Sequence, residues 1–385
     1  MLCGIVSIAS RYRINDYMNS DPSSRPNEPR LRDTLRSDFR TGDHWDTFRK
    51  EFRDLKEFYI DQDKKKRLDA MSPLQRWLYL SAWLGKSMLM KLTPHRRLIL
   101  VVGIFFLVAG PSIVYNGHKF QITNFYMLGG VAIFLVLMLE LKDKLLARDE
   151  LIAGKRVQQA LMPEQSPSVP GWSLWIYSRP ANEVGGDLID FLKKNDTQFG
   201  VALADVSGKG LQAALIMAKL QATLKALAAD YNSIGELITK LNAIFHRDGL
   251  PNSFASLVYA ELSSNSGMLR FVNAGHLPPV IMRTSGLEET EKGEAALGLI
   301  GTTKYQERQL ELHSGDLFVV YSDGLTEARN ERGEFFGVER FLKRLPSLKD
   351  RAPAEIGKAL LSEVDFFVNE APPNDDLSLI ILKRQ

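Results

Sequence analysis

Apolar residues are distributed unevenly along the 385 residues of the chain. Residues 11–42 are rich in Arg, Asp, Ser, Asn and Pro, so we predict a disordered tail over residues 1–42. From residue 43 onward, aromatic and aliphatic residues recur at steps of three and four, which is the period of one face of an amphipathic helix. This pattern predicts a helical region over residues 43–93.

The end of this region carries the segment SPLQRWLYLSAWLGKSMLMKL, in which Ser72 is the expected N-cap and Pro73 the first helical residue. Trp77, Tyr79 and Trp83 of this segment have Lys86 and Lys91 nearby, a composition that suits a helix lying on a membrane surface. An ordinary packed helical hairpin fits the same pattern equally well. Nothing in this region indicates chemistry.

Two long apolar runs follow, Leu98 to Tyr115 and Phe125 to Leu141, at the lower limit of the length that crosses a bilayer. Core helices rarely lack charge over such a length, so we predict a two-helix transmembrane hairpin over residues 94–141. Two buried core helices are the alternative. Lys and Arg residues flank the pair on both outer sides. The positive-inside rule then predicts a two-pass inner (cytoplasmic) membrane protein with both termini and the C-terminal domain in the cytoplasm.

The second run continues without a proline into a charged segment with an apolar stripe, and Pro163 follows it. We predict one long helix from Phe125 to Leu161, whose last part, residues 142–163, links the two halves of the chain. A stripe of this kind must pack against its own domain or against a second copy, which would make a homodimer through the linker helix.

From residue 164 onward, short alternating strands are separated by Gly and Pro turns and interrupted by two pairs of helices. This order predicts antiparallel sheets covered by helices, a layered α/β sandwich over residues 164–385. The net charge of +3, with acids and bases balanced, indicates no nucleic-acid partner. Cys3 is the only cysteine, so the chain has no disulfide framework and fits a reducing compartment.

Aspartates stand at the ends of several predicted strands or in the adjoining turns. Each one alone is compatible with ordinary turn chemistry. Together they indicate carboxylates gathered at one edge, where divalent cations would relieve their repulsion. Because the donors are all oxygen atoms, they favour Mg²⁺ or Mn²⁺ over zinc. The residues are Asp187, Asp190, Asp205, Asp323, Asp375 and Asp376.

The segment VALADVSGKG also contains a lysine between two glycines, which raises the question of a nucleotide site. A phosphate-binding loop of the G-x-x-x-x-G-K-[ST] type needs an earlier glycine and a following Ser or Thr. Leu203 and Gly210 occupy those positions, so the segment does not fit such a loop. Asp205, not Lys209, is therefore the residue of interest here.

Five segments, EVGGDLIDF, ADVSGKG, FVNAGH, YSDGLTEARN and NDDLSL, occur in this order between Gln158 and Leu382. In this order they resemble the metal-dependent protein serine/threonine phosphatases (PPM, protein phosphatase 2C-like), and most of all the bacterial SpoIIE-like sporulation and stress-response branch. The resemblance implies an α-β-β-α sandwich. It also implies a phosphatase that hydrolyses phosphoserine or phosphothreonine with two Mn²⁺ or Mg²⁺ ions.

The resemblance further implies the roles of individual residues. Asp205 would bridge the two metal ions, and the backbone carbonyl of Val206 would complete the shell of one of them. Asp323 and Asp375 would hold the other ion, and Asp187 would support the pair. Asp205 and Asp323 are thus the expected catalytic residues. A water shared by the ions would attack the phosphoryl group in line.

Several roles stay open at this level. Ser207 stands where the eukaryotic members carry a histidine, so the general acid is not identified. His276 is a candidate for that role, and local hydrogen bonds that make it a structural residue are the alternative. Asp190 and Asp376 are secondary candidates, either in the site or as caps and turns.

In the resembling branch the substrate is a small phosphoserine-bearing antagonist of an anti-sigma factor, in a partner-switching pathway. The rival interpretations are a catalytically inactive binding module of the same fold and a membrane scaffold.

Overall fold

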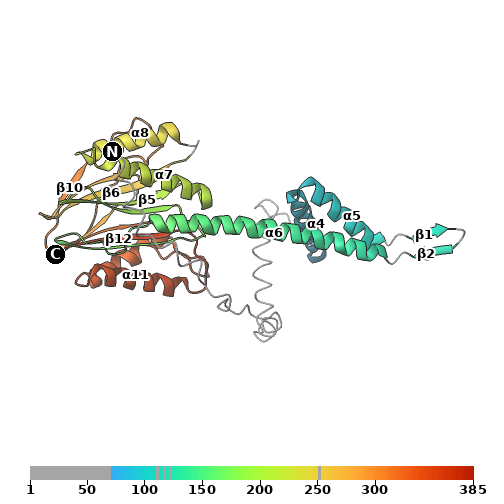
Figure 1. Ribbon diagram of the computed structural model, residues 1–385. Helices are drawn as coiled ribbons and strands as arrows, with labels where there is room; N and C mark the ends of the chain where they lie inside the picture. The colour runs from blue at the N-terminus through green and yellow to red at the C-terminus, as the bar shows by residue number, and fades with distance from the viewer. Residues whose placement is uncertain (1–70, 110–111, 116–117, 122–123, 250–252) are drawn as a thin grey trace, which may run out of the picture. The chain divides into compact units, whose positions relative to one another are not determined.

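The computed structural model describes residues 71–385 apart from 110–111, 116–117, 122–123 and 250–252 (Figure 1). The chain forms two compact units that meet after Leu139, and each unit is described by itself. The predicted tail over residues 1–42 lies outside the described residues, as does most of the predicted helical region before residue 71. The predicted domain boundaries after residues 93, 141 and 163 stay predictions.

The first unit contains α4 (Pro73–Lys91), α5 (Pro94–Ala109), a hairpin of β1 (Ser112–Tyr115) and β2 (His118–Gln121), and the beginning of α6 (Asn124–Leu161). As predicted, α4 starts with Pro73 directly after Ser72. The backbones of α5 and α6 approach closely at two glycines. A Cβ atom added to Gly129 would lie 2.6 Å from the carbonyl oxygen of Gly103, so no larger residue fits there without a shift.

The predicted transmembrane hairpin is wrong. The first apolar run does not form one continuous helix, because its helix ends at Ala109 and its last residues form the strand β1. The 16 residues of α5 extend over about 24 Å, less than the hydrocarbon core of about 30 Å. The second run is the start of α6, which continues into a charged segment. Within the described part of the chain, no helix is long and apolar enough to span a bilayer, and this overturns the predicted two-pass inner-membrane location.

The second unit contains two five-stranded sheets, each antiparallel throughout. The first has the order β10-β7-β6-β5-β4 and the second the order β3-β12-β11-β8-β9. The strands of the first sheet are β4 (Asp187–Lys193), β5 (Gln198–Val206), β6 (Ala255–Ser263), β7 (Met268–Ala274) and β10 (Arg308–Glu311). The strands of the second are β3 (Trp172–Arg179), β8 (Val280–Arg283), β9 (Gly286–Glu289), β11 (Leu317–Tyr321) and β12 (Leu377–Arg384).

Helices cover the outer face of each sheet (Figure 1). The first sheet is covered by α7 (Gly210–Ala228) and α8 (Ile234–Asp248). The second is covered by α11 (Pro353–Val368) and by α10 (Val338–Arg344) with the short 3₁₀ helix η3 (Leu345–Leu348). The predicted layered sandwich of two antiparallel sheets is confirmed.

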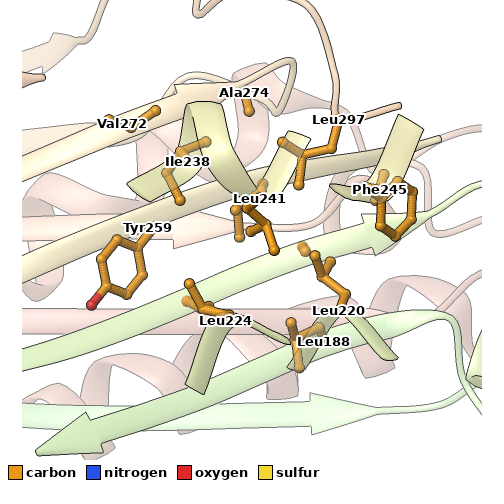
Figure 2. Close-up of a cluster of buried hydrophobic side chains, with 14 of the residues drawn as sticks. Leu188, Leu220, Leu224, Ile238, Leu241, Phe245, Tyr259, Val272, Ala274 and Leu297 are labelled. Carbon is orange, nitrogen blue, oxygen red and sulfur yellow. The ribbon is translucent and has the colours of Figure 1, made fainter. Parts of the chain in front are cut away.

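The alternation of residues along β5 explains these layers, because successive side chains of a strand point to opposite faces. Val201 and Leu203 lie in the core between the two sheets. Ala202 and Ala204 face the helices instead, in the cluster shown in Figure 2. There, Leu220 and Leu224 of α7 and Ile238 and Leu241 of α8 cover the sheet. Between the sheets, the rings of Phe271 and Phe318 pack with their centroids 5.4 Å apart.

Candidate active site

The pairing of β4 with β5 brings two of the predicted site residues together. Asp187 is the first residue of β4 and lies opposite Asp205, the last but one residue of β5. Cα atoms of directly paired residues in an antiparallel ladder lie about 4.5–5.5 Å apart. The two aspartates are therefore neighbours at one edge of the first sheet, although 18 positions separate them in the sequence.

The second sheet supplies the other predicted carboxylates. Asp323 follows β11 and begins the short helix α9 (Asp323–Thr326), and Asp375 lies just before β12. Because β11 and β12 pair antiparallel, with Tyr321 opposite Leu379, the end of one strand and the start of the other lie at the same edge.

Electrostatic interactions show that the two pairs face each other. Burial, together with the charges of Asp323, Asp375 and Asp376, raises the pKa of Asp205 to about 6. Burial also raises the pKa of Asp323, as does the charge of Asp375. The carboxylates that the sequence separates over nearly two hundred positions therefore share one electrostatic environment.

Asp187 is the most deeply buried of the four, with 3% of its surface exposed. Burial holds its pKa well above the usual range, the charges of Asp205 and Asp376 add to this, and hydrogen bonds with Ser378 and Ser322 oppose it. Its Oδ2 atom is buried and has no hydrogen-bond partner. A buried carboxylate oxygen without a partner is costly in a protein interior, so this atom is suited to a ligand.

The main-chain carbonyl of Val206 lies close to the loop that carries Asp187. Its carbonyl oxygen would lie 3.3 Å from a Cβ atom added at Gly186, the residue before Asp187. The absence of a side chain at position 186 thus leaves the loop before β4 close to this carbonyl. Among the described residues, no three His, Cys, Asp or Glu side chains are grouped closely enough to hold a metal ion as they stand. The residues match divalent cations in the type of donor atom, because all of them offer oxygen.

Asp376 has a different role from its neighbour Asp375. It is 8% exposed, and its carboxylate accepts hydrogen bonds from the main-chain N–H groups of Ala181 (2.7 Å), Gly186 (2.5 Å) and Asp187 (3.3 Å). These bonds tie the loop that carries Asp187 to the start of β12. The importance of Asp376 was underestimated from the sequence, where a second consecutive aspartate resembles an ordinary turn residue.

The other secondary candidates lie apart from this group of carboxylates. Asp190 is buried and pairs with Lys225 of α7, with 3.0 Å between Nζ and Oδ1. His276 is buried, and Asn273 holds its main chain by accepting from the His276 N–H (2.8 Å) and donating to its carbonyl (3.1 Å). Burial lowers the pKa of the His276 imidazole to about 4, so the ring is neutral at physiological pH. The structural interpretation of His276 therefore fits better than a role as general acid.

Lys209 is oriented toward the second sheet. Its Nζ lies 2.8 Å from the carbonyl oxygen of Asn374 and 3.2 Å from Oδ2 of Asp375. Its positive charge lowers the pKa of Asp205 and Asp323, against the effect of burial. The loop around Lys209 thus faces carboxylates, which agrees with the rejection of a phosphate-binding loop.

The C-terminal end of α6 contacts the loop before Asp187 through a buried side-chain amide. Gln158 is 6% exposed, donates from Nε2 to the carbonyl of Gly185 (2.9 Å), and accepts from the Gly185 N–H (3.1 Å). Lys155, one turn earlier, pairs with Glu183 at 3.3 Å. The only sequence signal of this contact was an uncharged polar residue within the apolar stripe of the helix.

Known proteins resemble this part of the chain. Residues 195–385 match the family described as Stage II sporulation protein E (SpoIIE). Protein IcfG of Synechocystis sp. is 27% identical over 273 residues, which cover 64% of this chain and 43% of IcfG. The phosphoserine phosphatase RsbU of Bacillus subtilis is 26% identical over 243 residues, which cover 62% of this chain and 71% of RsbU. The chain therefore spans less than half the length of IcfG.

Among solved structures, the SiaA-PP2C domain of Pseudomonas aeruginosa superposes with a TM-score of 0.55 and 19% sequence identity. The likeness covers 63% of this chain and 99% of that domain. At this level of identity, the similarity shows a common fold.

Proposed function

We propose that the C-terminal part of the chain is a metal-dependent protein serine/threonine phosphatase of the SpoIIE-like branch of the PPM family, on the basis of its similarity to that family and to RsbU. One observation carries the proposal. Two aspartates of the first sheet, Asp187 and Asp205, lie near two of the second, Asp323 and Asp375, and the charges of the second pair raise the pKa of Asp205. A fold has little reason to gather charges of one sign unless a cation or a reaction uses them.

The proposed site holds two Mn²⁺ or Mg²⁺ ions. Asp205 and the carbonyl of Val206 would bind one ion, Asp323 and Asp375 the other, with Asp205 shared and Asp187 in support. Such a pair of ions supplies an activated water and neutralises charge on a phosphoryl group. The catalytic residues of this proposal are Asp205 and Asp323.

The chain's own contribution is to position these oxygens. Asp376 holds the main chain of Gly186 and Asp187 through its carboxylate, and Gln158 holds Gly185 from the other side. Burial and the neighbouring carboxylates raise the pKa values of Asp187 and Asp205, because the ionised forms are unfavourable there without a cation.

We further propose that the substrate is a phosphoserine- or phosphothreonine-bearing regulatory protein in a partner-switching pathway. The support is the similarity to RsbU, whose name describes a phosphoserine phosphatase. A small antagonist of an anti-sigma factor fits this class. Incubation with phosphoserine-bearing protein and with phosphotyrosine-bearing protein tests the proposal, and equal release of phosphate from both would contradict it.

The linker part of α6 supports a proposed homodimer. Leu141 and Leu145 lie one turn apart on this helix, and 48% and 49% of their surfaces are exposed. Helices with exposed apolar stripes commonly pair with a second copy. Light scattering of the full chain at micromolar concentration measures the mass, and a monomer would refute this pairing.

The proposed activity is tested with p-nitrophenyl phosphate and Mn²⁺ on the full chain. Replacing Asp205→Asn removes a bridging charge, so we expect a loss of activity of at least about 100-fold, or about 3 kcal/mol in the barrier. The matched control is Asp196→Asn, because Asp196 lies in the turn after β4, is 94% exposed and pairs only with Lys193 there. Equal activity of Asp205→Asn and the wild type would reject the proposed site.

A further inference from the structure

The loop between β5 and α7 places a single lysine at the edge of the carboxylate group. Gly208 and Gly210 flank Lys209 with φ angles of +105° and +69°, which residues with side chains rarely adopt. The start of the loop is fixed, because Ser207 N–H donates to the Phe254 carbonyl and the Ser207 hydroxyl accepts from the Phe254 N–H, both at 2.9 Å. Lys209 therefore projects from a tight turn with a fixed base.

The lysine side chain crosses from the first sheet to the loop that precedes β12. It donates to the Asn374 carbonyl and pairs with Oδ2 of Asp375, while Oδ1 of Asp375 accepts the N–H of Asp376 at 3.0 Å. Both carboxylate oxygens of Asp375 are thus engaged. A metal ion that binds Oδ2 of Asp375 would have to replace the lysine, because two cations cannot share that position without strong repulsion.

The ion pair is also easy to break. The side chain of Lys209 is 61% exposed and that of Asp375 is 38% exposed, and exposed pairs of this kind contribute little to stability. A divalent ion carries twice the charge of an ammonium group and prefers several carboxylate ligands. Displacement of the Lys209 ammonium group from Asp375 by such an ion is therefore favourable.

We propose that Lys209 is a displaceable counter-ion of the carboxylate group, which occupies Asp375 before metal binding and so sets the metal concentration that the site requires. The proposal rests on the proposed phosphatase function, in which Asp375 is a metal ligand. It gives a role to the lysine of the Gly-Lys-Gly segment, which is neither part of a phosphate-binding loop nor a metal ligand.

Thermal unfolding of the full chain in increasing Mn²⁺ tests this inference without measuring activity. The wild type gives an apparent Kd for Mn²⁺ from the rise in Tm. Replacing Lys209→Met keeps the length of the side chain and removes the competing charge. We expect this variant to bind Mn²⁺ about tenfold more tightly, which corresponds to loss of one repulsive charge a few ångströms from the ion in a solvent-exposed site.

Two further variants act as controls. Lys209→Arg keeps the charge and should give a Kd near that of the wild type. Lys193→Met makes the same change in net charge at the other end of β4, where Lys193 pairs with Asp196, and should leave the Kd unchanged. An unchanged or weaker Kd in Lys209→Met would overturn the counter-ion role.

The failure of this inference is distinguishable from failure of the proposed function. If Mn²⁺ stabilises the wild type but not Asp205→Asn, the metal site stands, and an unchanged Kd in Lys209→Met refutes only the role of the lysine. If Mn²⁺ fails to stabilise even the wild type, the metal site and the counter-ion are both refuted. Far-ultraviolet circular dichroism confirms that each variant is folded, and the exposure of Lys209 favours this.

Discussion

Truncation of the consecutive aspartates Asp375 and Asp376 should affect two different properties, metal binding for Asp375 and stability for Asp376. Asp376 is buried and accepts hydrogen bonds from three main-chain N–H groups, whereas Asp375 is more exposed and pairs with an exposed lysine side chain. We expect Asp376→Ala to destabilise the metal-free protein strongly. Asp375→Ala should leave stability almost unchanged and should abolish metal binding instead.

The magnitude follows from the hydrogen bonds. A hydrogen bond to a charged acceptor contributes about 1.5–3 kcal/mol, and a buried N–H that loses its partner costs about 1–3 kcal/mol. The loss is reduced because Asp376 also repels Asp187 and Asp205, whose pKa values its charge raises. We therefore expect Asp376→Ala to lower the free energy of unfolding by about 3 kcal/mol. The exposed pair of Asp375 is worth at most about 1 kcal/mol.

Urea unfolding of both variants in EDTA, followed by tryptophan fluorescence, measures this difference. Trp172 and Trp175 lie in β3, which pairs with β12, so their fluorescence reports on the unfolding of the second sheet. A larger loss of stability in Asp375→Ala than in Asp376→Ala would refute the assignment of the two roles. So would retention of Mn²⁺ binding by Asp375→Ala.

Two further predictions concern the same loop and its charges. Burial raises the pKa of Asp205 from about 4 in the unfolded chain to about 6 in the folded protein. The folded state therefore binds this proton more tightly than the unfolded state does. The free energy of unfolding in EDTA should fall by at most about 3 kcal/mol as the pH rises from about 4 to about 6. Urea unfolding at several pH values checks this, and a wild-type pH dependence identical to that of Asp205→Asn would contradict it. Replacing Gln158→Ala should loosen Gly185 and weaken Mn²⁺ binding, measured by the rise in Tm, while Gln159→Ala on the exposed side of α6 should not. Equal Mn²⁺ binding in the two variants would show that Gln158 does not position the loop.

The layers of the second unit were predictable because alternation along a strand directly reflects the two faces of a sheet. In β5, large residues at positions 201 and 203 meet the second sheet, and alanines at 202 and 204 leave room for α7 and α8. The aspartates were predictable for a related reason, since strand ends that pair antiparallel meet at one edge. Both inferences use short-range rules that the fold does not override.

Other features depended on contacts that a local pattern does not contain. The sequence does not distinguish Asp375 from Asp376, because which of two adjacent side chains turns inward depends on the loop at Gly186. The membrane prediction failed because hydropathy does not show that the helix of the first apolar run ends at Ala109 and that the strand β1 follows. Gln158 was missed because its partner is main chain 27 positions away.

The four proposed metal ligands come in equal numbers from two sheets whose facing surfaces pack through apolar side chains such as Phe271 and Phe318. A change in the size of either ring alters how far the sheets stand apart, and with it the spacing of oxygen atoms at their common edge. The choice of residues in this apolar core is therefore constrained by the spacing of the carboxylates as well as by packing. A substitution there that leaves the protein well folded can still abolish metal binding.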